Sequence, residues 1–101
     1  MTPKIPSPPS HLSAPSKKLW TDILEQVDIV EQAQFSILAM GLEAVDRKNE
    51  ARRRLDDEGL TFLDRLEQIK PSPLCNIERD ARAAAMAAFK MLGLHMPLDG
   101  S

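Results

Sequence analysis

The chain has 101 residues and a formal net charge of −2, from 13 basic and 15 acidic side chains. This length allows one domain with a small core, so apolar surface left over from one protomer is expected to be covered by another copy. A mildly acidic chain is not an obvious nucleic-acid binder.

The composition predicts an all-α fold. Aromatic side chains make up only 4% of the sequence, whereas alanine, leucine, glutamate and arginine are abundant. The single cysteine, Cys75, excludes an intramolecular disulfide and fits a reducing compartment. No stretch approaches the about 20 apolar residues of a membrane span, and the N-terminus lacks the apolar core of a secretory signal. We therefore expect a cytoplasmic protein with no membrane contact.

Residues 1–12 are predicted to form a flexible, Pro-rich basic arm. Four prolines, Pro3, Pro6, Pro8 and Pro9, prevent a regular helix and favour extended, solvated backbone. The helical domain is expected to span residues 13–94. It begins with a short helix, for which Ser13 is the predicted N-cap, and which ends near residue 26 or 27.

A long helix is predicted from about residue 29 to residue 57. Its apolar side chains recur at spacings of three and four, and Gly59 supplies the stop. Residues 60–62 and 68–70 then form a small β-hairpin around residues 64–67, or a plain loop, since no glycine marks the turn.

The last helix is predicted over residues 73–92. Ser72 and Pro73 give a start signal and Gly93 gives the stop, while residues 95–101 form a C-terminal tail. The two long helices joined by a short connection suggest an antiparallel helical hairpin. Its apolar faces predict an interface between copies, formed by Phe35, Ile37, Leu38, Leu42, Val45, Ala84 and Ala88.

The sequence offers little for catalysis or metal binding. The candidate ligands His11, Cys75 and His95 lack the spacing of a metal site, and no glycine motif for phosphates or for a nucleophile occurs. Cys75 is more simply a small apolar residue on a helix. The carboxylates of residues 56–58 are better explained as partners of arginines than as an acid–base pair. We expect no catalytic residue, metal or cofactor.

The most conspicuous charged feature is the run at residues 46–58, which holds five basic and five acidic side chains. Helical spacing predicts ion pairs Glu43–Arg47, Glu50–Arg54, Arg52–Asp56 and Arg53–Asp57. Phosphate binding requires uncompensated cations, so a self-paired, solvated face is favoured over DNA contact. Arg47, Lys48, Arg52 and Arg53 are therefore the weaker DNA-binding candidates.

The uncompensated cations lie at the N-terminus. Lys4, Lys17 and Lys18 all precede the first acid, Asp22, and the rest of the chain carries a net charge of −5. These three lysines are the leading candidates for DNA contact. In an oligomer each copy would supply the same lysines, so weak contacts with DNA would add through avidity. Simple solubilisation of the surface is the competing explanation.

Short motifs, read in order, resemble the phage terminase small-subunit family. They are Pro8-Pro9-Ser10-His11-Leu12-Ser13-Ala14-Pro15-Ser16-Lys17-Lys18-Leu19-Trp20, Glu43-Ala44-Val45-Asp46-Arg47, Glu58-Gly59-Leu60-Thr61-Phe62, Glu78-Arg79-Asp80-Ala81-Arg82 and Leu92-Gly93-Leu94. The resemblance covers roughly residues 8–95.

The resemblance implies a ring-forming component of a DNA-packaging motor, from a phage, a prophage or a gene-transfer particle. Such a protein recognises double-stranded DNA and presents it to the large terminase subunit, which holds the ATPase and the nuclease. The resemblance supplies no catalytic residue. Two other functions remain open: an oligomeric adaptor or scaffold without nucleic-acid binding, and a small transcriptional regulator.

Overall fold

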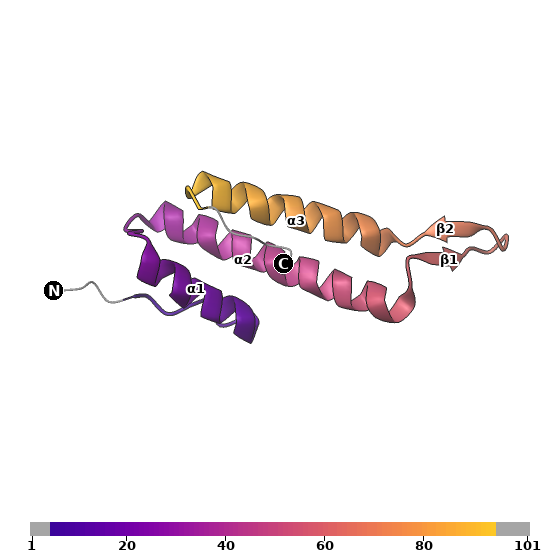
Figure 1. Ribbon diagram of the computed structural model, residues 1–101, viewed down its shortest axis with the longest axis horizontal. Helices are drawn as coiled ribbons and strands as arrows, with labels where there is room; N and C mark the ends of the chain where they lie inside the picture. Colours follow the sequence, from indigo (N-terminus) through magenta and orange to yellow (C-terminus); the bar gives the residue numbers. More distant parts are fainter. Residues whose placement is uncertain (1–4, 95–101) are drawn as a thin grey trace.

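The computed structural model describes residues 5–94, and within this range it contains three helices and one β-hairpin. The elements are α1 (Ala14–Gln26), α2 (Gln32–Glu58), β1 (Thr61–Leu63), β2 (Ile69–Pro71) and α3 (Pro73–Met91). α2 and α3 lie antiparallel and side by side, and α1 packs against α2 (Figure 1). The predicted helical fold, with its antiparallel hairpin of long helices, is confirmed.

The helix ends follow their sequence signals. Ser13 caps α1 by accepting a hydrogen bond from the backbone N–H of Ser16 at 3.2 Å, and Ser72 caps α3 by accepting one from Leu74 at 3.2 Å. Gly59 and Gly93 end α2 and α3 with φ values of 91° and 75°, which strain any side chain. α2 begins three residues later than predicted, because Glu31 and Gln34 form a capping box.

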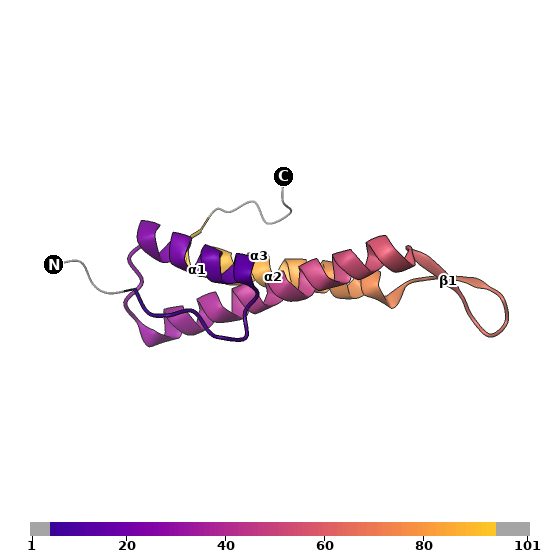
Figure 2. The ribbon, with the colours of Figure 1, turned by 90° about the horizontal axis from the view of Figure 1, so that it is seen from below.

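The predicted β-hairpin is present, paired as Thr61–Pro71, Phe62–Lys70 and Leu63–Ile69. Its turn needs no glycine. The Asp64 carboxylate accepts hydrogen bonds from the backbone N–H groups of Leu66 and Gln68, at 2.8 and 2.9 Å, and Glu67 takes the positive φ of 59°. The hairpin extends beyond the helices in both views (Figures 1 and 2), so nothing from α1 covers it.

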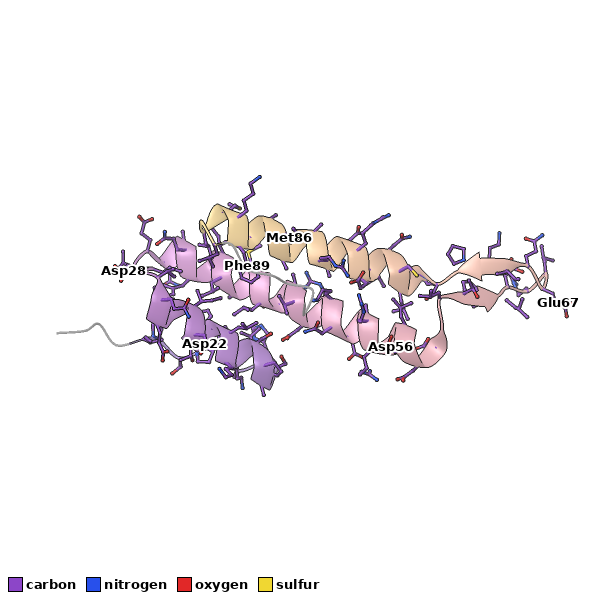
Figure 3. All side chains as sticks on the ribbon, in the orientation of Figure 1. Asp22, Asp28, Asp56, Glu67, Met86 and Phe89 are labelled. Atoms are coloured by element: carbon purple, nitrogen blue, oxygen red, sulfur yellow. The ribbon has the colours of Figure 1, made fainter. Side chains whose placement is uncertain are left out.

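The core lies where α2 meets α3 and α1. Leu38 and Leu42 of α2 are fully buried, and Phe89 of α3, which points toward α2 (Figure 3), is 2% exposed. Gly41 allows the close approach of the two long helices, because a Cβ there would lie 3.0 Å from the Cβ of Ala88. α1 adds Trp20, whose ring centroid lies 6.2 Å from that of Phe35.

The N-terminal segment makes defined contacts with the helices. Residues 5–12 pack on the helices where a mobile arm was expected: the Trp20 indole N–H donates to the carbonyl of Pro6 at 2.9 Å, and Leu12 is only 4% exposed. The prolines predict that this segment is not helical, and residues 5–12 contain no helix. Such an extended backbone is still held in place by one buried side chain, Leu12, and by one hydrogen bond, from Trp20. Lys4, His95 and the predicted tail at 95–101 lie outside the described residues.

Between residues 5 and 94 no helix has the length and apolar character needed to cross a membrane.

Candidate nucleic-acid interface

The first turn of α1 is fixed to the middle of α2 by one carboxylate. Asp46 accepts hydrogen bonds from the backbone N–H of Ser13 at 2.9 Å, from the Ser13 hydroxyl at 2.6 Å and from the Ser16 hydroxyl at 2.5 Å. A negative charge at a helix N-terminus is also favoured by the helix dipole. Partial burial raises the pKa of Asp46, but the hydrogen bonds from Ser13 and Ser16 outweigh it and lower the pKa overall.

A second contact lies beside the first. His11 Nε2 is 2.6 Å from the Glu43 carboxylate, one helical turn before Asp46 on α2. Glu43 therefore faces the N-terminal segment, and the predicted Glu43–Arg47 pair does not form. This junction between α1 and α2, defined by His11, Ser13, Ser16, Glu43 and Asp46, sets the position of the neighbouring cations.

Two cations border the junction without an ion pair. Lys17 follows Ser16, and Arg47 follows Asp46, so each is next in the chain to one end of the 2.5 Å hydrogen bond. Lys17 is half-buried and Arg47 is exposed, and neither has a carboxylate within ion-pair distance among the described residues. They are the cations of this region that remain available to phosphate.

Lys18 differs from Lys17. It pairs with Asp22 one turn along α1 at 2.9 Å, and the hydrogen bond that Lys18 donates to the Asp22 carboxylate raises the pKa of Lys18. Because both side chains are exposed, the pair is weak and a phosphate could compete for the lysine. The structure thus separates two lysines that the sequence ranked together.

The arginine run is self-paired, although not as helical spacing predicted. Arg53 forms the predicted pair with Asp57 at 3.3 Å but also binds Glu50 at 2.5 Å, which lowers the pKa of Glu50 through that hydrogen bond. Arg54 then pairs with Glu58 at 2.9 Å.

Arg52 reaches across to α3. Its guanidinium lies 3.5 Å from Glu78, whose carboxylate also binds Arg82, so the predicted pair with Asp56 is replaced by a contact between helices. Glu78 is only 12% exposed in its side chain, and the two cationic partners offset the cost of burying its carboxylate. Lys48 is only 7% exposed, so its side chain is buried within the protomer and is not on a surface that DNA can contact.

Two further cations without ion pairs within residues 5–94 lie on the β-hairpin: Arg65 and Lys70. Arg65 is not among the cations predicted from the sequence to contact DNA. The structure uses Asp64 to hold backbone N–H groups of the turn, which leaves the arginine alone.

The side chains expected at an interface between copies divide into two groups. Leu38 and Leu42 are 0% exposed, Val45 is 6% and Ala88 is 9% exposed, so the protomer's own core takes them up. Phe35 and Ile37 are half-buried, and Ala84 is exposed. Sequence periodicity identifies an apolar face, but it does not say which neighbour covers that face.

The exposed apolar surface of α3 includes Ile77, Ala84 and Met91. These residues recur every seventh position, so they lie along one side of the helix. Ile77 is 47% and Met91 is 72% exposed. With Ala84 small between them, the stripe allows a second helix to approach closely.

Within the described part of the chain, no three histidine, cysteine or acidic side chains gather as a metal site would require. Cys75 is half-buried, and its thiol lies 3.9 Å from the carbonyl of Leu60.

Comparison with known proteins matches most of the chain to one family model. The family model described as "Phage terminase, small subunit" matches residues 16–96. YjbB of Salmonella typhimurium (strain LT2), a protein named for inorganic phosphate export, is 39% identical over 59 residues, which cover 58% of this chain but only 11% of that protein. No solved structure gives a significant match.

Proposed function

Because this chain belongs to the phage terminase small-subunit family, we propose that it is the DNA-recognition subunit of a viral-type packaging motor. The family assigns it a role in phage DNA packaging. The finer proposal is that several copies form a ring, bind double-stranded DNA, and present it to the large terminase subunit, which supplies ATP hydrolysis and cleavage. The match to YjbB covers too little of that protein to support a role in export.

The observation that carries DNA binding is the pair of unpaired cations at the α1–α2 junction. Lys17 and Arg47 are held beside the Ser16–Asp46 hydrogen bond, so their backbones have fixed positions. When Lys17 and Arg47 bind DNA phosphates, they displace counterions condensed on the DNA without first breaking a protein ion pair. The arginine run lacks this property, because Arg52, Arg53 and Arg54 already have carboxylate partners.

Assembly is proposed to use the stripe of Ile77, Ala84 and Met91 on α3. These exposed apolar side chains remain after the protomer has buried Leu38 and Leu42 in its own core. A contact between this stripe and a different face of the next copy is heterologous, and such contacts close into a ring when the rotation permits. Repetition around the ring would multiply a modest DNA contact by avidity.

The test compares two double variants with the same change in charge. Lys17→Gln with Arg47→Gln removes the unpaired cations, whereas Lys18→Gln with Arg53→Gln removes cations that have partners. Binding to duplex DNA is measured by fluorescence anisotropy between about 50 and 200 mM salt. We expect the first variant to weaken binding and to flatten the dependence of log affinity on log salt, and the second to change both much less.

The same measurement separates the alternatives. Equal losses in the two variants would contradict the assignment to Lys17 and Arg47. A wild-type protein that forms oligomers but shows no DNA binding at the lowest salt would contradict the packaging proposal and support an adaptor or scaffold. Stimulation of the ATPase of a cognate large subunit would support presentation of DNA to that subunit.

A further inference from the structure

The β-hairpin carries apolar side chains that the rest of the described chain leaves uncovered. Leu63 is 65%, Leu66 is 76% and Ile69 is 73% exposed, and Phe62 is 46% exposed. Two strands of three residues each form a sheet that is marginally stable in water by itself. The hairpin projects beyond α2 and α3, with Glu67 at its tip (Figure 3), and none of the helices of the same chain packs on it.

Only one edge of this two-stranded sheet is able to accept another strand. The Ser72 N–H donates to the Leu60 carbonyl at 2.8 Å and the Asp64 N–H donates to the Gln68 carbonyl at 3.0 Å, so residues 60, 62 and 64 bond inward across the hairpin. By the alternation of an antiparallel ladder, the backbone groups of Thr61 and Leu63 point away from β2. The outer edge of β1 therefore offers two N–H donors and two carbonyls.

The outer edge of β2 is incomplete. The corresponding outward positions there are Ile69 and Pro71, the cross-strand partners of Leu63 and Thr61. Pro71 has no N–H, and proline on an edge strand is a common way to prevent pairing. A partner strand would therefore add to β1 and not to β2.

We propose that the β1 edge pairs, antiparallel, with the β1 edge of a second copy of this chain. The strand is self-complementary: with Phe62 on a two-fold axis, Thr61 of each copy exchanges backbone hydrogen bonds with Leu63 of the other. The result is a four-stranded sheet in which the two phenylalanines are direct neighbours.

Charge favours a second copy as the occupant. The four charged residues of the hairpin, Asp64, Arg65, Glu67 and Lys70, sum to zero, so two hairpins do not repel each other. Antiparallel pairing also brings Arg65, which follows β1, toward the acidic end of the second copy's α2, where Asp56 lies (Figure 3). Acidic side chains at a helix C-terminus oppose the dipole, and an added cation relieves this.

This contact is symmetric and uses the end of the molecule, whereas the proposed ring contact uses the side of α3. It would join two protomers end to end, and it would join two rings if rings form. The inference does not depend on DNA binding.

The test is cross-linking of the full chain through position 62. In a Cys75→Ser background, Phe62→Cys places two thiols at a non-hydrogen-bonded pair, where Cα atoms lie about 4.5 Å apart and a disulfide fits. Leu66→Cys in the same background is the matched control, because residue 66 is exposed but lies off the axis. Under mild oxidation with oxidised glutathione, we expect Phe62→Cys to give a band at twice the 11.3 kDa chain mass at least tenfold faster than the control.

A second pair of variants tests the edge itself. Added to Phe62→Cys, Leu63→Pro removes an outward N–H from β1, whereas Ile69→Pro removes the equivalent N–H from β2. We expect the first to reduce cross-linking at least tenfold and the second to leave it unchanged, with the circular dichroism spectrum of the helices as a check on folding. Equal cross-linking of Phe62→Cys and Leu66→Cys, or equal loss with both prolines, would overturn the proposal.

Discussion

Asp46 of α2 and Ser16 of α1 meet through a hydrogen bond of 2.5 Å, although 30 residues separate them in the chain. Ser16 is 0% exposed, so its hydroxyl has no access to water in the folded protein. This hydrogen bond therefore gives the buried Ser16 hydroxyl an acceptor. It also fixes α1, which carries Lys17, against α2, which carries Arg47.

Replacement of Asp46 by alanine should destabilise the protein and release α1. An unsatisfied buried hydroxyl costs about 1–3 kcal/mol, and the Ser13 N–H loses its partner as well. Urea unfolding gives the change in stability, and the emission of Trp20, the only tryptophan, should shift to longer wavelength as the indole becomes hydrated.

Asp22→Ala is the control for this variant, because it removes an exposed carboxylate paired with Lys18 on α1. Its expected cost is within about 0.5 kcal/mol. Similar destabilisation by the two substitutions would mean that Asp46 contributes no more than a surface ion pair.

The same carboxylate predicts how stability depends on pH. The pKa of Asp46 is lowered in the folded protein, whereas an unfolded aspartate titrates near ~3.9. The stabilisation is therefore fully present above about pH 5 and is lost as the pH falls below about 4, where the folded carboxylate takes up a proton. Urea midpoints of wild type and Asp46→Asn, measured from pH 7 to pH 3, should converge at the acid end. A constant difference across this range would show that the charge of Asp46 does not matter.

The contact between α2 and α3 is tightest at Gly41. An alanine there would place its Cβ 3.0 Å from the Cβ of Ala88 and 3.2 Å from the ring of Phe89. We expect Gly41→Ala to destabilise by about 1–3 kcal/mol from overpacking, reduced by the up to ~1 kcal/mol that alanine gains in helix propensity. Ser36→Ala on the exposed side of α2 should stay within about 0.5 kcal/mol of wild type. A neutral or stabilising Gly41→Ala in urea unfolding would show that the helices can move apart at no cost.

Local signals in the sequence predicted the elements well, and the contacts between elements poorly. Ser13, Ser72 and Gly59 determine helix ends through bonds within a few residues, so they can be read directly. The burial of Leu12 and the hydrogen bonds from α1 to Asp46 depend on residues that folding brings together from a distance. No short-range pattern in the sequence predicts such contacts.

The candidate site shows the same division. Lys17 was identified because no acid precedes it, and the structure leaves it without an ion pair among residues 5–94. Arg47 was ranked low because helical spacing assigned it Glu43, a carboxylate that His11 occupies in the fold. Charge counting along one helix fails where another segment competes for the same carboxylate.

The proposed ring contact predicts that two neighbouring alanines of α3 respond differently to the same substitution. Ala83 and Ala84 are both exposed, but only Ala84 lies on the stripe with Ile77 and Met91. Glutamate is a good helix former, so either change should leave the protomer folded. Ala84→Glu places a charge in the proposed interface and should lower the mass measured by light scattering at tens of micromolar protein, whereas Ala83→Glu should keep the wild-type mass. Dissociation by both variants alike, or by neither, would exclude the stripe as the surface that joins the copies.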